Sequence, residues 1–365
     1  MGCRIIYDNL ILRAGNVIVP SSEVTSLPRA ALLRPLLSDV LRFKLGWDIN
    51  GDNADIDFDR GGPHTAVVAT ANYPTGASLA AVIEPALEAA EGGAPDYVGS
   101  YSGTTHFYTL LRNGGIAWTV NFATGPNLAK SMALDLGFPE TDNTAITQVS
   151  SAVAYQSRRT VNVDLGAAAT FGAAIIGGHN VSAAGTVRLD AKASDMLGQG
   201  MRSSVATFSA TLAGSSGLRL AYFSNQSFRY LRLVITDVQN PAGYNELGVF
   251  SVAPVLDLIG FDVNVVDERE ELSDVAFAIG GAQHQISRPA RKVWHLTLHA
   301  IDDAKKVELE TFAASVKLGG CFFFDFDGLG TNVRYVFLDR GLSFQAQETV
   351  PRTWTVEMML KESLG

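Results

Sequence analysis

The chain has 365 residues, of which 47% are hydrophobic and 18% charged, so it can build two or three domains with sizeable cores. Its formal net charge is −9, and it has no Lys/Arg-rich run, which argues against a nucleic-acid partner and against binding to an anionic membrane surface. The 35 glycines are spread between short strand-like runs, and this pattern favours a mainly β chain with many turns.

Cysteine usage and apolar runs bear on the cellular compartment. Cys3 and Cys321 lie far apart in the sequence and indicate neither a disulfide framework nor a zinc site. Residues 1–10 contain no signal-peptide core, and no apolar run approaches the ~20 residues that span a bilayer. We therefore expect a chain made in a reducing cytoplasm, without membrane insertion.

The first 148 residues divide into two parts. Residues 1–41 predict a strand, a Pro/Ser turn and a short apolar helical stretch, and residues 42–148 predict an inserted α+β module. In the module, Ser78 is a candidate N-cap for a helix that ends at Gly92-Gly93, and Pro85 predicts a kink in that helix. A second, short helix is expected within residues 127–139.

An acidic run lies near the start of the module, at Asp48, Asn50, Asp52, Asp55, Asp57 and Asp59. Oxygen ligands at alternate positions around Gly51 are typical of a calcium loop, but the glycine and glutamate spacing of an EF-hand is absent. Alternation with Ile56 and Phe58 instead fits an edge or surface strand with solvated carboxylates. Both alternatives stay open from the sequence.

The module is also rich in aromatic residues, namely Tyr101, Phe107, Tyr108, Trp118 and Phe122. Exposed aromatic rings could form a platform on which sugars stack. The alternation of these residues along predicted strands favours core positions for most of them.

Residues 149–255 have the pattern of an antiparallel sandwich. Residues 161–165 alternate apolar with polar side chains, as in a half-buried strand, whereas residues 230–235 carry bulk on both faces, as in a central strand. Gly, Asn, Ser and Pro clusters separate the strands, which is typical of a jelly roll. His179 and Asn180 follow Gly177-Gly178 in a tight turn and are candidate ligand-binding residues, although such an Asn can simply set the turn geometry.

Residues 256–365 predict a β-barrel or sandwich with one packed helix. Asp302-Asp303 should open the helix and Gly319-Gly320 should end it. The expected apolar positions of this helix are Val307, Leu309, Phe312, Val316 and Leu318. His295 and His299 share one face of a predicted strand, where they could bind a metal, but no third ligand is evident and a surface or interface role is favoured.

Two runs of opposite charge lie in this last region. The acidic run contains Asp267, Glu268, Glu270 and Glu271, and the basic run contains Arg288, Arg291 and Lys292. We interpret them as complementary partners across an interface between copies, because charge complementarity sets the register of an interface.

Motifs of catalysis are absent from the sequence. It contains no G-x-S-x-G, no Walker loop, no G-x-G-x-x-G after a strand and no H-E-x-x-H. The carboxylates of residues 268–271 lie in a charged linker and do not suggest a glycosidase pair. We predict no enzymatic activity, no catalytic residue, no metal and no cofactor.

Four motifs, in this order, resemble the galactose-binding-like (discoidin-type) jelly roll, and more narrowly the version in tail-tip proteins of long-tailed bacteriophages. They are Asp164-Leu165-Gly166, His179-Asn180-Val181-Ser182, residues 229–237 and residues 240–248. Residues 128–138 resemble a module of phage tail and fibre proteins. The strands at 291–296 and 354–362, with the helix between them, resemble the tail-tube-like fold of minor and distal tail proteins.

The resemblance implies a mainly β chain with a jelly roll in residues 1–41 and 149–255, the insertion in 42–148 and a tail-tube-like barrel in 256–365. It implies a virion component, made in the bacterial cytoplasm, that assembles into a ring in a tail tip or baseplate. Its partners would be other tail proteins, fibres and further copies of itself. The alternative is a carbohydrate-binding adhesin or accessory module for a host-surface glycan. A glycan-cleaving enzyme is a third hypothesis, and it would need two carboxylates in one cleft.

Overall fold

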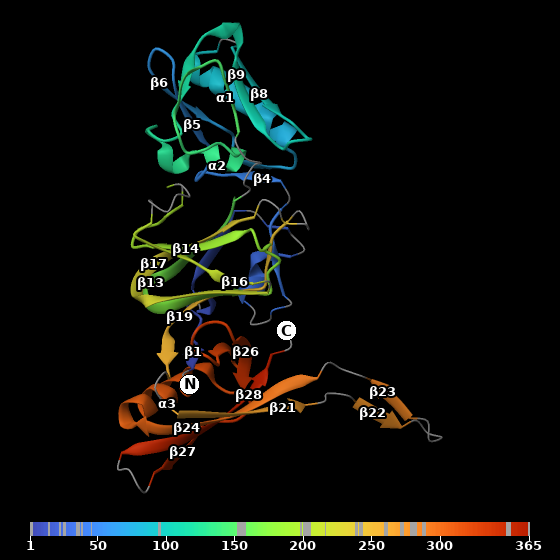
Figure 1. The fold of residues 1–365 in the computed structure, drawn as a ribbon, viewed down its shortest axis with the longest axis vertical. Coiled ribbons are helices and arrows are strands. Elements are labelled where there is room, and N and C mark those ends of the chain that lie inside the picture. Colours follow the sequence, from blue (N-terminus) through green and yellow to red (C-terminus); the bar gives the residue numbers. More distant parts are fainter. Residues whose placement is uncertain are drawn as a thin grey trace.

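The computed structural model describes residues 3–363 apart from 14, 22, 25–26, 34–36, 38, 45, 94–95, 152–157, 198, 200–205, 216, 238–239, 241–243, 259–261, 271–273, 278–282, 287–289 and 348–351. The chain is mainly β with a few helices. It forms three tiers stacked along the long axis, with the insertion at one end, a sandwich in the middle and the C-terminal sheet at the other end (Figure 1).

The insertion contains three small antiparallel sheets around one core that runs from Trp47 to Val149. The sheets are β4 (Trp47–Ile49) with β7 (Ala71–Tyr73); β11 (Asn143–Ile146), β10 (Trp118–Val120), β5 (Asp55–Asp59) and β6 (Pro63–Val67); and β12 (Gln148–Ser150), β9 (Tyr108–Arg112) and β8 (Tyr97–Tyr101). Its helices are α1 (Gly76–Glu91) and α2 (Ala133–Leu136), with single 3-10 turns at Asn113–Gly115 and Leu128–Lys130.

Helix α1 begins at Gly76, two residues before the predicted cap. Its N-cap is Thr75, whose hydroxyl accepts from Ser78 N at 3.1 Å, while Ser78 Oγ accepts from Thr75 N at 3.2 Å. This reciprocal capping box satisfies two N-terminal amides, so the prediction of Ser78 as N-cap was wrong. Pro85 lies inside the helix, which continues to Glu91 and ends at Gly92 in the left-handed region (φ 102°).

The acidic strand β5 is central in its sheet, between β10 and β6, and the predicted edge or surface strand is therefore wrong. Asp55 and Asp57 are buried. Thr65 Oγ1 and the backbone N of Asn127 each donate to Asp57 at 2.7 Å, so neighbouring protein groups replace water around this carboxylate. Burial raises the pKa of Asp55.

The middle tier is an antiparallel sandwich of the jelly-roll kind. The strand order is β15 (Phe208–Thr211), β14 (Thr186–Lys192), β17 (Leu218–Thr236), β13 (Arg158–Gly177) and β19 (Val249–Ala253), with β16 (Ala213–Ser215) on β17 and β2 (Val17–Pro20) on β13. Two further strands, β3 (Leu41–Arg42) and β18 (Glu246–Leu247), pair with each other, and 3-10 turns lie at Leu10–Leu12 and Arg29–Leu33.

Strand β13 bends the sandwich sheet over its own core. Its register with β17 shifts between Asp164 and Ala169, where Gly166 has a φ of 73°. Val161 lies before the bend and Ile176 after it, and both belong to the same buried core. The prediction that residues 230–235 form a central strand is confirmed, because β17 lies between β14 and β13.

The C-terminal sheet has the order β20 (Val255–Asp257), β1 (Arg4–Ile6), β25 (Cys321–Asp325), β26 (Val333–Leu338), β28 (Thr353–Glu362), β24 (Arg291–Asp302) and β21 (Asp262–Glu270), with β27 (Ser343–Ala346) on β28. A separate hairpin, β22 (Asp274–Phe277) with β23 (Gln283–Ile286), projects from this tier (Figure 1). Helix α3 (Asp303–Val316) lies on the sheet and buries Leu309 and Phe312.

Two predictions about this tier need correction. The predicted barrel is wrong, because among the described residues the sheet is an open path that ends at β20 and β21. Closure requires matched strands, whereas β20 has three residues and β21 has nine. Residues 1–41 were also placed in the jelly roll, but β1 pairs with β20 and β25 and completes the C-terminal sheet.

Helix α3 largely follows its prediction. Asp302 is the N-cap and accepts from the backbone N of Lys305 at 2.7 Å. Val307, however, is exposed, because the helix contacts the sheet with a narrower face than the apolar pattern suggested. The helix ends at Val316, before the predicted end at Gly319-Gly320, so Leu318 lies in the following turn and is exposed.

Buried arginines join the insertion to the sandwich. Arg158, at the start of β13, donates from Nε to Asp135 Oδ1 at 3.0 Å and also from Nη2 to the same carboxylate. Asn53 Nδ2 donates to Asp135 as well, at 3.2 Å. Burial opposes the charge on Arg158, but the Asp135 carboxylate raises the pKa of Arg158 above its ordinary value.

Two further arginines extend this junction. Arg159 Nη2 donates to the carbonyl oxygen of Lys44 at 2.9 Å. Arg232 Nη2 donates to Asp52 Oδ2 at 3.1 Å, and its Nε donates to Asn162 Oδ1 at 2.7 Å. The insertion is therefore oriented on the sandwich by directional polar contacts.

Candidate ligand-binding cleft

The sandwich and the C-terminal sheet meet through apolar side chains. Ala173 and Ile175, on the face of β13 that points away from the sandwich core, pack with Ile6, Phe323 and Tyr335 of the C-terminal sheet. This contact fixes the two tiers relative to each other, and the hollow beside it has walls from both tiers.

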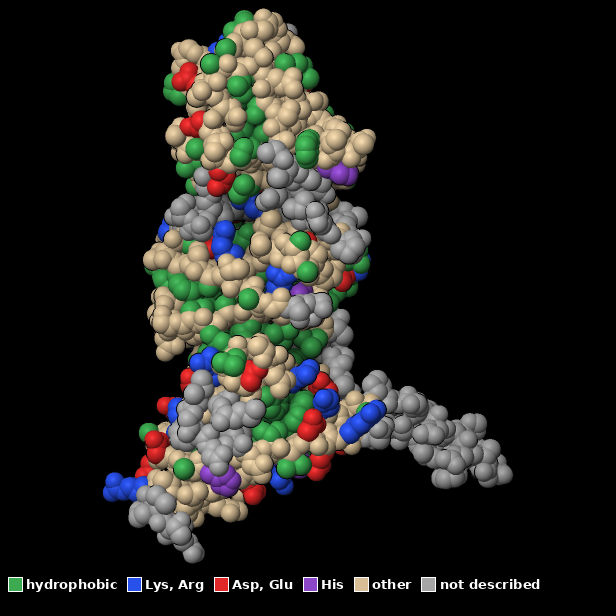
Figure 2. Space-filling view, viewed as in Figure 1, with side chains coloured by type: hydrophobic (Ala, Val, Ile, Leu, Met, Phe, Trp, Pro, Cys, Tyr) green, Lys and Arg blue, Asp and Glu red, His purple; other side chains and the backbone are tan. Residues whose placement is uncertain are grey.

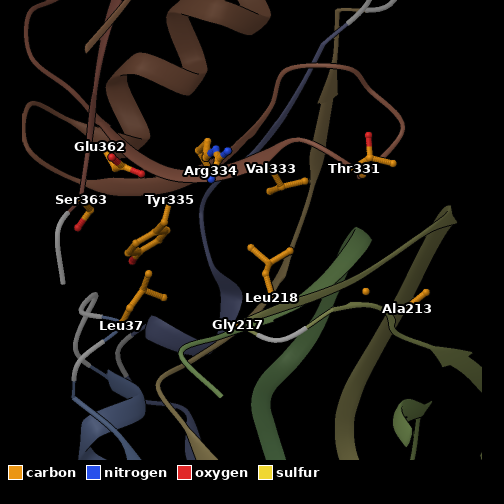
Figure 3. A pocket seen from close by; sticks show the side chains of 12 residues that line it. Leu37, Ala213, Gly217, Leu218, Thr331, Val333, Arg334, Tyr335, Glu362 and Ser363 are labelled. Atoms are coloured by element: carbon orange, nitrogen blue, oxygen red, sulfur yellow. The ribbon is translucent and has the colours of Figure 1, made fainter. Parts of the chain in front are cut away.

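The hollow is a cleft of about 570 Å³ between the β16–β17 turn and the loop before β26. Figure 3 shows Leu218 from the sandwich facing Val333 and Tyr335 from the C-terminal sheet, with Leu37 at one end. The full lining is Leu37, Ala213, Gly214, Gly217, Leu218, Gly330, Thr331, Val333, Arg334, Tyr335, Glu362 and Ser363.

The cleft combines an apolar wall with a few polar groups. Thr331, Arg334, Glu362 and Ser363 supply hydroxyl, guanidinium and carboxylate groups. Arg334 is exposed and forms no ion pair within the described part of the chain. These four polar residues all come from the C-terminal tier, and the sandwich supplies apolar surface. A mainly apolar cleft with a few polar groups is the usual composition of a small-molecule site.

A buried carboxylate holds the loop that forms one side of the cleft. Asp325 is fully buried and accepts from Tyr222 Oη at 2.8 Å and from Gly330 N at 2.9 Å. Burial raises the pKa of Asp325, and the neighbouring Asp327 raises it further. Because Tyr222 belongs to the sandwich and Gly330 to the C-terminal sheet, this one carboxylate ties both walls of the cleft together.

The same loop is braced from its outer side by Asp327. The backbone N of Leu329 donates to Asp327 Oδ1 at 2.9 Å, and the Thr331 hydroxyl donates to the other oxygen. Although burial acts to raise it, hydrogen bonds with Asp325, Thr331 and backbone amides hold the pKa of Asp327 well below its usual range. The loop therefore presents Thr331 to the cleft in one conformation.

The sequence-predicted ligand residues His179 and Asn180 lie in a loop behind this cleft and do not line it. The Asn180 amide donates to the Tyr244 carbonyl oxygen at 2.9 Å and accepts from Glu246 N at 2.7 Å. His179 Nδ1 accepts from the backbone N of Val181 at 3.2 Å, and burial lowers the pKa of His179 to about 4. Both side chains organise the loop.

The cleft residues were missed in the sequence because their signal is weak. Thr331 and Arg334 follow a glycine-rich turn between two strands, which reads as an ordinary hairpin. Glu362 and Ser363 come at the end of the last strand, where alternation stops being informative. The pairing of β26 with β28 brings these positions together, and the packing of the sandwich against this sheet adds the apolar wall.

The residues predicted for an interface between copies pair within one chain, because β21 and β24 are neighbours. Lys292 Nζ lies 3.9 Å from Asp267, and Lys361 Nζ lies 3.1 Å from Glu270. Glu268 is 3.3 Å from His295.

The Arg291 guanidinium lies over the Phe337 ring, 5.2 Å from its centroid. Glu271 and Arg288 lie outside the described residues. Figure 2 shows charged side chains gathered over the C-terminal sheet, with few on the insertion. The interface between copies stays a prediction.

The other candidate sites from the sequence do not converge on a ligand. Across the described residues, no group of three His, Cys, Asp or Glu side chains is placed to hold a metal ion. Asp52 pairs with Arg232 and Asp57 accepts a hydrogen bond from Thr65, so the carboxylates of the acidic run have separate protein partners and do not share one site. None of the described helices combines the length and apolar character that a membrane span requires.

The aromatic residues of the insertion mostly form its core. Tyr108, Trp118 and Phe122 are buried, while Tyr101 and Phe107 are half-buried. This confirms core positions for most of the set. A smaller hollow of about 180 Å³ on the outer face of the sandwich includes Asn162 and Asp164, whose oxygens already accept from arginines.

Comparison with known proteins gives partial likenesses only. No family model and no curated protein matches the chain. Chitosan-binding module 1 from a chitosanase/glucanase of Paenibacillus sp. IK-5 is 18% identical, with a TM-score of 0.19, over 28% of this chain and 77% of that chain. The Clostridium perfringens module CpGH89CBM32-5, in complex with GalNAc-β-1,3-galactose, is 12% identical, with a TM-score of 0.19, over 27% of this chain and 68% of that one.

A third likeness is to the GH78 family rhamnosidase of Bacillus sp. GL1, with 12% identity and a TM-score of 0.22, over 59% of this chain and 22% of that chain. TM-scores of this size carry no argument about fold or ligand. The jelly-roll description therefore rests on the strand pairing given above, and what these proteins bind is a property of theirs.

Proposed function

We propose that this chain is a non-catalytic carbohydrate-binding protein and that the cleft between the sandwich and the C-terminal sheet is its glycan site. The cleft is the observation that supports the proposal. Its volume of about 570 Å³ suits a short oligosaccharide, and ligand pockets of proteins commonly span roughly 300–1,000 Å³.

The lining has the chemistry that a sugar needs. A pyranose ring presents apolar C–H groups on its faces and hydroxyl groups around its rim. Leu218 and Val333 supply apolar surface for the first, while Arg334 donates and Glu362 accepts hydrogen bonds for the second. Charge-assisted hydrogen bonds of this kind are about twice as strong as neutral ones.

The same lining argues for binding without hydrolysis. Glycoside hydrolysis generally uses two carboxyl groups about 5–10 Å apart on either side of the bond. Glu362 is the only carboxylate among the residues that line the cleft, all of which are described. Bound sugar would therefore be held but not cleaved, which agrees with the absence of catalytic motifs in the sequence.

The test is titration of the full chain with a panel of oligosaccharides, read by calorimetry. Arg334→Gln should weaken binding of any glycan that the wild type binds by about tenfold or more, since one charge-assisted hydrogen bond contributes about 1.5–3 kcal/mol. The matched control is Arg340→Gln, at an exposed arginine that lies just after β26 and does not line the cleft. A panel without any binder, or equal losses in both variants, would count against the proposal.

A structural role in a larger assembly is the second candidate, as the phage tail-tip resemblance implies. The open C-terminal sheet is the observation that favours it, because its outer strand β21 is paired on one side only among the described residues. Sedimentation of the full chain over a hundredfold concentration range would test self-assembly. Strictly monomeric behaviour would leave only partner-dependent assembly.

A further inference from the structure

Strand β21 is a long edge strand that contains no proline, lysine or register shift. It pairs with β24 from Asp262 to Glu270 and with no other strand in the part of the chain that the structure describes. Alternate backbone N–H and C=O groups on its outer side therefore lack a sheet partner there. Natural edge strands of this length are commonly blunted by proline, bulges or lysine, since an open edge templates pairing with another chain.

The middle of this edge is apolar. Val265 and Val266 are 39% and 48% exposed and point to opposite faces of the sheet, because successive strand residues alternate. Charged residues follow only after them, at Asp267 and Glu268. An added strand could therefore bury apolar side chains on both faces while its backbone pairs with β21.

A pocket of about 450 Å³ opens beside the edge on one face. Trp294 and Phe326 line it, with ring centroids 5.0 Å apart, and Val265 and Asp267 of β21 form one side. Val265 is in register with Leu296 and Asp267 with Trp294, so this face of β21 continues directly into the aromatic residues. A side chain on a strand added beyond β21 would reach this pocket.

The charge around the edge selects the occupant. Residues 262–270 contain four acidic residues and one arginine. In the pocket, the carboxylates of Asp267 and Asp327 are balanced by Lys292 and Arg334. Lys292 lies 3.9 Å from Asp267. The excess of carboxylates is therefore on β21 itself, whose side chains would be the direct neighbours of an added strand, and it favours a basic strand.

A second copy of the same strand fits poorly. Antiparallel pairing centred on Val266 sets Val265 against Asp267 and gives Glu268 no basic neighbour. Parallel in-register pairing sets Asp267 against Asp267 and Glu268 against Glu268, and like charges directly opposite each other are destabilising.

We propose that β21 binds an extended segment of a partner protein, in which lysine or arginine alternates with apolar residues. The segment adds a strand to the open edge, one of its apolar side chains enters the Trp294–Phe326 pocket, and its basic side chains face Asp267 and Glu268. Backbone pairing supplies affinity and the pocket supplies specificity, as in other strand-addition interfaces. The inference narrows the assembly role to a partner of stated chemistry, and its pocket shares Arg334 with the cleft.

The experiment uses the full chain and two dye-labelled, end-blocked peptides, one alternating valine with lysine and one alternating valine with glutamate, with binding read by fluorescence anisotropy. The lysine peptide should bind at least tenfold more tightly than the glutamate peptide, and added salt should reduce that ratio. Asp267→Lys should shift the preference towards the glutamate peptide.

Val266→Glu should weaken binding of the lysine peptide at least tenfold. The matched control is Val67→Glu, because Val67 is 64% exposed on β6, which is also the edge of its sheet. Circular dichroism checks that each variant is folded. Equal binding of both peptides, or equal loss in the two valine variants, would overturn the proposal. Concentration-dependent dimers that only Val266→Glu abolishes would also overturn it, by showing that the occupant is a second copy.

Discussion

The two junctions between tiers are built in opposite ways. The insertion meets the sandwich through Arg158, Arg159 and Arg232, which are buried and bonded to carboxylates and carbonyl oxygens. The sandwich meets the C-terminal sheet through apolar contacts such as that of Ile175 with Phe323. Buried ion pairs add little net stability after desolvation but are costly to break singly, whereas apolar contacts stabilise in proportion to the buried area.

This difference has a consequence for function. A polar junction fixes one orientation, because each guanidinium must meet its carboxylate at hydrogen-bond distance. The junction between the sandwich and the C-terminal sheet, beside which the cleft lies, is mainly apolar but includes the hydrogen bond that Tyr222 Oη donates to Asp325 at 2.8 Å. The width of the cleft is therefore set by apolar packing together with this one directional contact.

The largest expected effect comes from breaking the polar junction on one side only. Arg158→Ala leaves the Asp135 carboxylate buried without its guanidinium, and we expect a loss of about 3–5 kcal/mol of unfolding free energy, measured by urea denaturation. Replacing both Arg158 and Asp135 by leucine should recover most of this loss. The control Arg13→Ala, in an exposed ion pair with Asp8, should change stability by less than about 1 kcal/mol.

The apolar junction should respond to lost volume. Ile175→Ala removes buried methyl groups from the contact with Phe323 and should cost about 2–4 kcal/mol. Because the cleft is adjacent, this variant should also weaken glycan binding, whereas Arg158→Ala should not once folding is corrected for. If both variants weakened glycan binding equally, the cleft would not lie at the junction between the sandwich and the C-terminal sheet.

Acid should act through His179. Burial lowers its pKa in the folded chain to about 4, below the ordinary value of 6.5, so between these pH values the unfolded chain binds a proton that the folded chain does not. Stability should therefore fall as the pH drops from about 6.5 to 4. His179→Gln should make the unfolding free energy less dependent on pH between 4 and 6.5. An unchanged dependence would show that other titrating groups cause the loss of stability in acid.

The smallest effect is expected at the cap of α1, inside the insertion. Thr75→Ala removes the hydroxyl that accepts from Ser78 N and should cost about 1 kcal/mol. Hydrogen exchange should rise in the first turn of α1 alone. Faster exchange at Arg158 as well would mean that the stability of the polar junction is coupled to that of the interior of the insertion.

Local patterns in the sequence predicted much of the fold. Alternation identified the central strand that contains Arg232, and Asp302 marked the start of α3, because both signals lie within a few residues. The burial of Asp55 and Asp57 was not predictable, since their partners come from a different strand and a distant loop. The open sheet also escaped prediction.

The candidate site was less predictable than the fold for the same reason. His179 and Asn180 stand in a recognisable turn, yet the Asn180 amide and His179 Nδ1 are used in backbone hydrogen bonds of the surrounding loops. Arg334 and Glu362 carry no motif, and they meet because β26 pairs with β28, while Leu218 faces them only because the sandwich packs against this sheet. Contacts between tiers are long-range, and no local pattern encodes them.

Methyl NMR of the leucine and valine side chains can locate the glycan site. On addition of a bound oligosaccharide, we expect shifts at Leu37, Leu218 and Val333, which line the cleft, and none at Val67 in the insertion. Shifts at Val17 and Leu197 instead, which line the small hollow on the outer face of the sandwich, would contradict this location.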